Sequence, residues 1–160
     1  MVAQAGLVSA LLAGSLLTTF ESTLNFANER QQFGRPIGKF QAIQHELAVM
    51  AEHVSAARMA AQIGCEAGGA LADPLKVAVG KARTGEAAVE VASLAHSIHG
   101  AIGFTTEFDL QLFTRRLHLW RQTAGSESYW QLQAGQALVA AGGMSLDVIR
   151  QITDSAAVAA

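Results

Sequence analysis

The sequence predicts an all-α protein, an up-and-down bundle of four to five main helices. The chain has 160 residues, of which 51% are apolar and 15% charged, a composition typical of one globular domain with a hydrophobic core. Only two prolines, Pro36 and Pro74, interrupt it, so long helices can run unbroken. No strand-like alternation of useful length appears, and long helices joined by short loops form bundles.

The first predicted helix lies in the charge-free stretch from Met1 to Phe20. Such a stretch is typical of a buried helix, a signal peptide or a membrane span. A signal peptide opens with positive charge, whereas the first charged residue here is Glu21. Polar and small residues also dilute the apolar run: Gln4, Gly6, Ser9, Ala10, Gly14, Ser15, Thr18 and Thr19. Because small residues at this spacing allow close helix packing, we expect a central helix of a soluble protein and no membrane span.

The second predicted helix has the clearest periodicity in the chain. Its apolar residues recur at alternating steps of three and four, which places them on one stripe of a helix: Phe40, Ile43, Leu47, Met50, Val54, Ala57 and Ala61. The residues between them form a mostly polar opposite face: Gln44, His45, Glu46, Glu52, His53 and Arg58. Pro36 and Gly38 mark the entry to this helix, and the glycines of residues 64–69 mark its exit.

The third predicted helix begins with a strong signal. Asp73 can cap the first turn, and Pro74 suits the first helical position because it has no amide hydrogen to satisfy. This helix runs to Ile98 and stops at Gly100. Shorter helices are predicted over residues 110–120, from Ser126 to residues 142–143, and over 146–152. We therefore divide the chain into a bundle over residues 1–142 and a short C-terminal helix with a tail over 143–160.

The charge and cysteine content exclude several classes of protein. A net charge of −2 gives no electrostatic argument for binding nucleic acid or an anionic membrane. Cys65 is the only cysteine, so no internal disulfide can form and a reducing compartment, the cytoplasm, is expected.

Metal and nucleophile motifs are weak. No glutamate is followed by histidine at the third position, and His96 and His99 have no carboxylate nearby, so a hydrogen-bonding role is favoured and no metal site is predicted. Cys65 has no adjacent base to lower its pKa and is interpreted as inert. Residues 100–103 contain two glycines but follow no strand, so they are interpreted as a helix stop and not as a dinucleotide fingerprint.

The segment from Glu29 to Gln41 concentrates cations and aromatic rings between two apolar helices. Arg30, Arg35 and Lys39 lie close in sequence to Phe33 and Phe40. An anionic ligand with a flat ring, such as a nucleotide, would suit this combination. The alternative is a solvated loop whose cations complement the helix dipole.

Two motifs resemble a known family. Residues 29–41 read ERQQFGRPIGKFQ and are followed by Leu47 and Met50, similar to the hallmark that opens the second helix of the acyl-CoA dehydrogenase C-terminal domain. Residues 99–107 read HGAIGFTTE and are followed by Asp109 and an arginine pair, similar to the second hallmark of that family. The resemblance covers residues 3–142 in order.

The resemblance implies a helical bundle that follows an N-terminal helical domain and a middle β domain. The complete enzyme binds FAD and oxidises acyl-CoA to 2-enoyl-CoA in fatty acid metabolism. Its flavin lies between the middle and C-terminal domains, and the adenosine and diphosphate end crosses a dimer interface. By this resemblance, Arg30 and Phe33 meet that end from the neighbouring subunit. Ser97 and Gly100 meet the diphosphate, and Ser126 stands where a threonine usually contacts the cofactor.

The sequence departs from the family at its catalytic base. The family usually has a glutamate before a Gly-Thr pair, and the matching position here is Ala124. Some members carry the glutamate on the first helix instead, where Gln4 stands here. Glu127 is the nearest carboxylate, reached only if the alignment shifts by three residues. The family also often has glutamine where this chain has Ser97, which shortens or removes one cofactor hydrogen bond.

These features lead to a flavoprotein component that contributes FAD-binding and oligomerising surface without a catalytic base of its own. We expect a homo-oligomer, a partner chain that carries the N-terminal and middle domains, and an acyl-CoA substrate in the complete assembly. The isolated chain is expected to be inactive. Two alternatives stay open: a self-associating helical module that binds no flavin, and an active protein with Glu127 as the base.

Overall fold

The computed structural model describes residues 1–66, 72–142 and 145–153. Among these residues six α-helices follow one another: α1 (Val2–Glu29), α2 (Gln41–Cys65), α3 (Pro74–His99), α4 (Leu110–Gln122), α5 (Glu127–Ala141) and α6 (Ser145–Thr153). A short antiparallel hairpin, β1 (Gln31–Gln32) and β2 (Arg35–Pro36), and the 3-10 turn η1 (Ile37–Lys39) join α1 to α2. A second 3-10 turn, η2 (Gly100–Phe104), follows α3. The predicted all-α bundle is confirmed.

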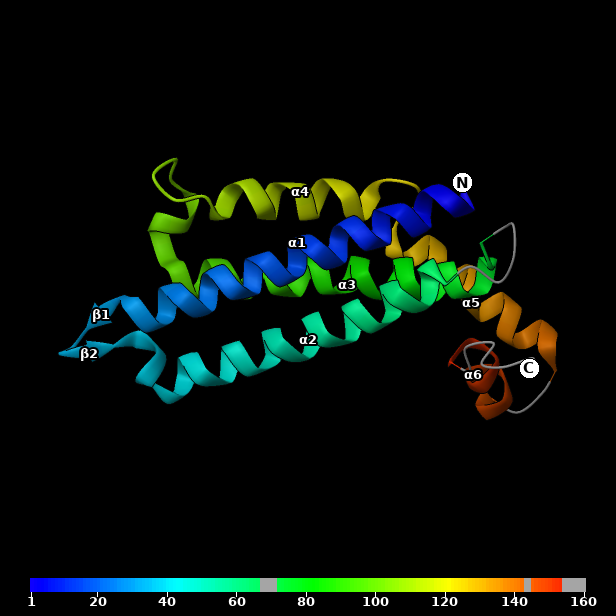
Figure 1. The fold of residues 1–160 in the computed structure, drawn as a ribbon, viewed down its shortest axis with the longest axis horizontal. Helices are drawn as coiled ribbons and strands as arrows, with labels where there is room; N and C mark the ends of the chain where they lie inside the picture. The colour runs from blue at the N-terminus through cyan, green and yellow to red at the C-terminus, as the bar shows by residue number, and fades with distance from the viewer. Residues whose placement is uncertain (67–71, 143–144, 154–160) are drawn as a thin grey trace.

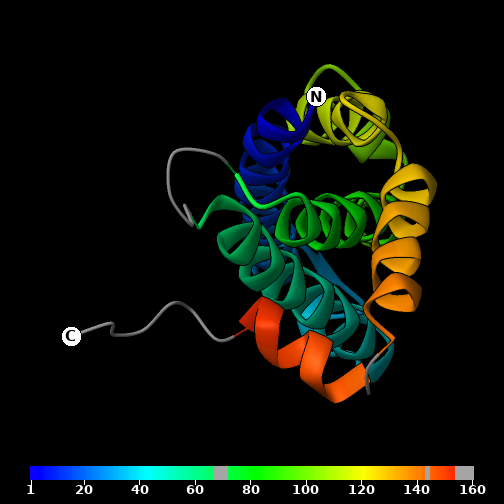
Figure 2. The ribbon, with the colours of Figure 1, turned by 90° about the vertical axis from the view of Figure 1, so that its right-hand side faces the viewer.

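Helix α3 occupies the centre of the bundle. It contacts α1, α2, α4 and α5, and the end-on view shows these four helices around it (Figure 2). The sequence-based expectation that α1 is central is wrong, because Leu7 and Leu11 of α1 are 69% and 52% exposed. The small residues of α3 explain its place: Ala87, Ala88, Ala92 and Ala95 are buried and let neighbouring backbones approach.

Helix α1 buries several hydroxyl groups, and three of them bond to the helix backbone, while the buried Ser15 Oγ has no partner among the described residues. The hydroxyls of Ser9, Thr19 and Thr23 donate to the carbonyl four residues earlier, at 2.9, 2.8 and 2.7 Å. By length and composition α1 is apolar enough to cross a membrane. In this fold it packs on α2, α3 and α4, alongside which it runs for much of its length (Figure 1).

The apolar stripe of α2 forms its buried face, as predicted. Leu47, Met50, Val54, Ala57 and Ala61 are buried, while Phe40 and Ile43 are partly buried against the same core. The helix ends at Cys65, and the glycines predicted to mark its exit lie partly outside the described residues.

The helix ends follow local capping chemistry. Asp73 Oδ1 accepts hydrogen bonds from the amides of Leu75 and Lys76 at 2.8 and 3.2 Å, which confirms the predicted start of α3. Helix α4 runs two residues beyond the predicted end at residue 120, and α6 is one residue longer at each end than predicted. Residues 154–160 of the predicted tail lie outside the described residues, and the domain division at residue 142 stays a prediction.

Candidate functional site

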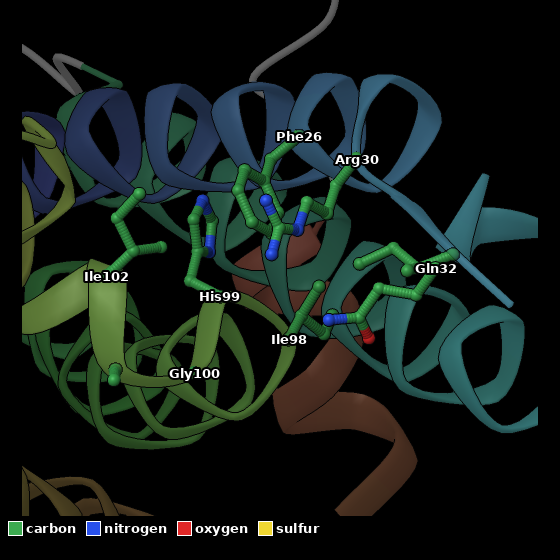
Figure 3. A pocket seen from close by; sticks show the side chains of 9 residues that line it. Phe26, Arg30, Gln32, Ile98, His99, Gly100 and Ile102 are labelled. Atoms are coloured by element: carbon green, nitrogen blue, oxygen red, sulfur yellow. The ribbon is translucent and has the colours of Figure 1, made fainter.

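Two adjoining grooves lie at the end of the bundle that carries the hairpin. The smaller, of about 280 Å³, is lined by Phe26, Arg30, Gln32, Ile37, Ile98, His99, Gly100, Ala101 and Ile102 (Figure 3). The larger, of about 470 Å³, is lined by Gln32, Phe33, Ile37, Phe40, Ala42, Ile43, Ser97, Ile98, His99 and Gly100. The shared lining joins the segment after α1 to the last turn of α3, which are far apart in sequence.

The hairpin presents Phe33 to solvent. Phe33 and Gly34 have φ angles of 52° and 81°, which form a two-residue hairpin loop of the kind that requires positive φ at both central positions. Phe33 is 91% exposed, with its ring edge-on to Phe40 at 6.1 Å. The segment interpreted as a loop therefore contains a hairpin. Sequence patterns missed it because each strand is two residues long and Phe33 stands where asparagine is typical.

Arg30 and Arg35 occupy different environments on this segment. Arg30 follows the last residue of α1 and lines the smaller groove. The guanidinium carbon of Arg35 lies 4.2 Å from the centroid of the Phe40 ring, a cation–π contact. Arg30 is therefore the arginine of this segment placed at the grooves.

His99 forms a buried floor between the two grooves. It is 5% exposed, and its ring stacks on Phe26 at 4.2 Å and lies 4.8 Å from Phe108. Burial lowers the pKa of the imidazole, although the hydrogen bond to the Ala95 carbonyl opposes this effect, so the ring is neutral at pH 7. The sequence pattern indicated only a structural or hydrogen-bonding role for His99. Its position as the last residue of α3 and the first of the hallmark segment 99–107 was the available signal for the groove.

Four of the five predicted cofactor residues converge at the grooves. Arg30, Phe33, Ser97 and Gly100 all line one or both of them. The Ser97 hydroxyl donates to Glu46 Oε1 at 3.2 Å, so it is engaged with α2. Ser126 lies apart from them: its side chain caps α5 by accepting from the Tyr129 amide at 3.4 Å.

The turn between α4 and α5 carries Ala124, which the sequence resemblance predicts to stand at the position of the family's base. Ala124 and Gly125 have φ angles of 58° and 98°, so an ordinary side chain is held in a left-handed conformation. The Nζ of Lys81 donates to the carbonyls of Arg121 and Gly125 at 2.7 and 2.8 Å. Trp130 Nε1 donates to the Ala124 carbonyl at 2.9 Å. The turn is thus fixed from α3 and from α5.

The buried Lys81 lies near an ion pair of Arg121 with the partly buried Glu127 behind this turn. Lys81 is 0% exposed, and burial lowers its pKa from 10.5 to about 8 against the opposing attraction of Glu127. Glu127 pairs with Arg121. Although burial raises the pKa of the Glu127 carboxyl, the hydrogen bond from Arg121 and the nearby positive charges lower it overall. Arg121 engages Oε1 of Glu127, and the lowered pKa makes the carboxylate a weak proton acceptor, which is a poor arrangement for a general base.

Other predicted candidates show no site chemistry. Gln4 is exposed on α1, and Cys65 is exposed with Sγ 3.6 Å from the Gly6 carbonyl. No group of three or more metal-ligating side chains gathers anywhere in residues 1–66, 72–142 and 145–153.

Comparison with known proteins identifies the family. The family profile described as "Acyl-CoA dehydrogenase, C-terminal domain" matches residues 3–139. The chain is 39% identical to glutaryl-CoA dehydrogenase of Desulfococcus multivorans over 108 residues, which cover 66% of this chain and 28% of that protein. The chain spans about a third of the length of the curated relatives that it matches, 28–37%.

Solved structures give the same result. A glutaryl-coenzyme A dehydrogenase in complex with glutaryl-CoA superposes with a TM-score of 0.75 at 32% identity, over 86% of this chain and 35% of that one. The ChsE4–ChsE5 complex from Mycobacterium tuberculosis superposes with a TM-score of 0.77 at 25% identity, over 86% of this chain and 38% of that one. With its helical bundle and its two hallmark segments at one groove, the chain belongs to the acyl-CoA dehydrogenase family and corresponds to the C-terminal domain.

Proposed function

We propose that this chain supplies FAD-binding and oligomerising surface to an acyl-CoA dehydrogenase assembly and has no catalytic base of its own. The observation that carries the proposal is the convergence of Arg30, Phe33, Ser97 and Gly100 from two distant segments on adjoining grooves. A cation beside an exposed aromatic ring suits a nucleotide with a diphosphate. Membership of a flavoprotein family makes the adenosine and diphosphate end of FAD the proposed occupant.

The grooves fit that group chemically. Arg30 would bind phosphate, and Phe33 offers an exposed ring face. Gly100 has a φ of 65°, and no atom lies within 4 Å of where a Cβ would stand, so a ligand can approach the backbone there. FAD, when bound, accepts the hydride that leaves an acyl-CoA.

The rest of the catalytic machinery is proposed to come from elsewhere in the assembly. The aligned part of this chain covers 31% and 28% of two matched relatives, and the proposed source of the N-terminal and middle domains is a partner chain. One similar solved structure is itself a complex of two named components, ChsE4 and ChsE5. The acyl-CoA substrate would bind in the complete assembly, which we place in the cytoplasm. Ser126 would contact the cofactor from the α4–α5 turn of its own subunit.

Replacing Arg30 by alanine tests the cofactor contact. ADP, the relevant end of FAD, is expected to shift the amide NMR signals of residues 97–102 in the purified chain. Loss of a charge-assisted hydrogen bond to phosphate in Arg30→Ala should weaken ADP binding by about 10- to 150-fold, or about 1.5–3 kcal/mol. Arg35→Ala is the matched control, because Arg35 contacts Phe40 and its replacement removes the same charge from the same segment between α1 and α2.

An equal loss in both arginine variants would mean that only net charge matters and that the Arg30 contact is misplaced. If ADP does not shift the NMR signals of the groove residues in the native chain, the alternative is favoured, a helical module that binds no flavin.

The purified chain alone should be colourless, because a fragment that contacts one side of a ligand binds it weakly.

Self-association is predicted from apolar side chains left uncovered on two helices. Leu7 and Leu11 of α1 are 69% and 52% exposed, and Leu119 of α4 is 65% exposed. Exposed apolar area of this kind marks an interface. Sedimentation should show a dimer or tetramer for the native chain and a smaller species for a Leu7→Gln, Leu11→Gln variant. A native monomer at micromolar concentration would contradict the prediction.

A further inference from the structure

His99 carries an acceptor that nothing in the described bundle satisfies, and the role inferred for it rests on the proposed function of the grooves. Its Nε2 is buried and has no hydrogen-bond partner among the described residues. The ring packs between the apolar side chains of Phe26 and Phe108. Figure 3 shows it standing up from the end of α3 toward α1, with Ile102 on one side. A buried polar atom left unpaired is costly, so such an atom in a native protein calls for a partner in some functional state.

The tautomer of His99 is set by its other nitrogen. Nδ1 lies 2.8 Å from the carbonyl oxygen of Ala95, and a carbonyl only accepts, so Nδ1 must carry the proton. In the neutral ring Nε2 then has a lone pair and can only accept. The missing partner is therefore a hydrogen-bond donor, which excludes a bare phosphate oxygen.

Arg30 is the donor best placed to reach it. Arg30 and His99 line the same groove, and Figure 3 shows the guanidinium of Arg30 turned back toward Phe26 and His99. The Arg30 side chain makes no hydrogen bond or ion pair with any of the described residues. A guanidinium has five N–H donors in a planar fork, so it can give one to a ring nitrogen and the others to a phosphate.

We propose that His99 is a positioning residue for Arg30, whose guanidinium donates to His99 Nε2 while its remaining N–H groups bind the diphosphate of a nucleotide. Arg30 is exposed and sits just after the end of α1, where a long side chain has many conformations. In the bound state, the hydrogen bond to a ring fixed by two aromatic neighbours holds the guanidinium at the phosphate and offsets part of the cost of ordering the side chain. His99 acts through Arg30 and does not itself touch the ligand.

A double-mutant cycle on ADP binding to the full chain tests this proposal. His99→Phe keeps a flat ring between Phe26 and Phe108 but removes the acceptor. In the protein that keeps Arg30, this change should weaken ADP binding by about 2- to 10-fold, which corresponds to the loss of one hydrogen bond. In the Arg30→Ala background the same change should matter by less than about twofold, because coupled residues are not additive.

The outcomes distinguish failure of the role inferred for His99 from failure of the proposed nucleotide-binding function. If Arg30→Ala weakens ADP binding but His99→Phe does not, or if His99→Phe is equally harmful in both backgrounds, His99 does not position Arg30 while the grooves still bind nucleotide. If ADP leaves the groove signals of the native chain unchanged, the proposed function fails, and this inference fails with it.

A second measurement needs no substitution at His99, so it does not depend on whether the His99→Phe protein folds. In the native chain, ADP should move the ¹⁵N resonance of His99 Nε2 upfield, as expected when an unprotonated ring nitrogen accepts a hydrogen bond, while Nδ1 stays protonated. In Arg30→Ala at saturating ADP the Nε2 resonance should stay at its free position. The same upfield shift in both proteins would overturn the proposal, since the donor would then be the ligand.

Discussion

Replacing Lys81 by methionine is expected to lower the free energy of unfolding by about 2–4 kcal/mol, because two carbonyl groups lose their hydrogen-bond donor. The Nζ of Lys81 donates to Arg121 and Gly125, and methionine keeps the length of the side chain while removing both bonds. The turn also holds Ala124 at a φ of 58°, a conformation that persists only where its surroundings fix it. Denaturant unfolding of the two proteins measures the difference. Lys76→Met is the matched control, because Lys76 pairs with the partly exposed Glu66 and a pair of that kind contributes little.

The pH dependence of this difference is a direct test of the buried charge. The pKa of Lys81 is about 8 in the folded protein and 10.5 ordinarily. Between these values the unfolded chain binds more protons than the folded one, so stability rises with pH across that window. The gain amounts to about 3 kcal/mol at most, from about 1.4 kcal/mol per pKa unit. The advantage of the native protein over Lys81→Met should therefore grow from pH 8 to 10.5. A constant difference would show that Lys81 titrates at its ordinary value.

Much of this fold could be predicted because its signals are local. The apolar stripe from Phe40 to Ala61 depends only on helix periodicity, and the start of α3 depends on Asp73 and Pro74 acting over one turn. The turn residues after α3 likewise stop the helix where expected, at Gly100. Such features need no knowledge of what packs against the helix.

The features that sequence reasoning missed depend on distant partners. Lys81 stands in a stretch of small residues, and its carbonyl partners lie 40 and 44 residues later in the chain. A lysine is usually exposed, so nothing local indicated a fully buried one. The central position of α3 was missed for a related reason: an alanine-rich helix has a weaker apolar pattern than α1, but its small side chains let four helices approach.

The candidate site likewise has some features that the sequence indicates and others that depend on the fold. The cations and rings of residues 29–41 are enough, as sequence, to indicate an anionic ligand with a flat ring. The meeting of that segment with Ser97, His99 and Gly100 required the fold, or the family resemblance, to become visible. The unsatisfied nitrogen of His99 had no sequence signal at all, because it depends on the direction of the ring relative to Ala95.

Ala124→Glu is expected to have the largest effect on activity, and only in the complete assembly. The reaction needs a base within hydrogen-bond reach of the α-hydrogen, and a positioned general base contributes about 10²- to 10⁴-fold. In complex with a partner that carries the N-terminal and middle domains, Ala124→Glu should raise acyl-CoA turnover by about that factor at the site formed by this chain. The chain alone should stay inactive with either residue, because a domain that contacts one side of the flavin is expected to bind this hydride acceptor too weakly.

Glu127→Gln distinguishes this prediction from the remaining alternative, in which Glu127 is the base. Glu127 is paired with Arg121 and its carboxyl pKa is lowered, so it is a weak proton acceptor near neutral pH and is not free to approach a substrate. Turnover of an acyl-CoA with an electron acceptor should therefore be the same for Glu127→Gln and the native chain, each measured with the partner. Thermal unfolding of both proteins would separate lost stability from lost catalysis. If turnover of the native assembly disappears in Glu127→Gln while the fold persists, the base is present after all and lies three residues beyond Ala124.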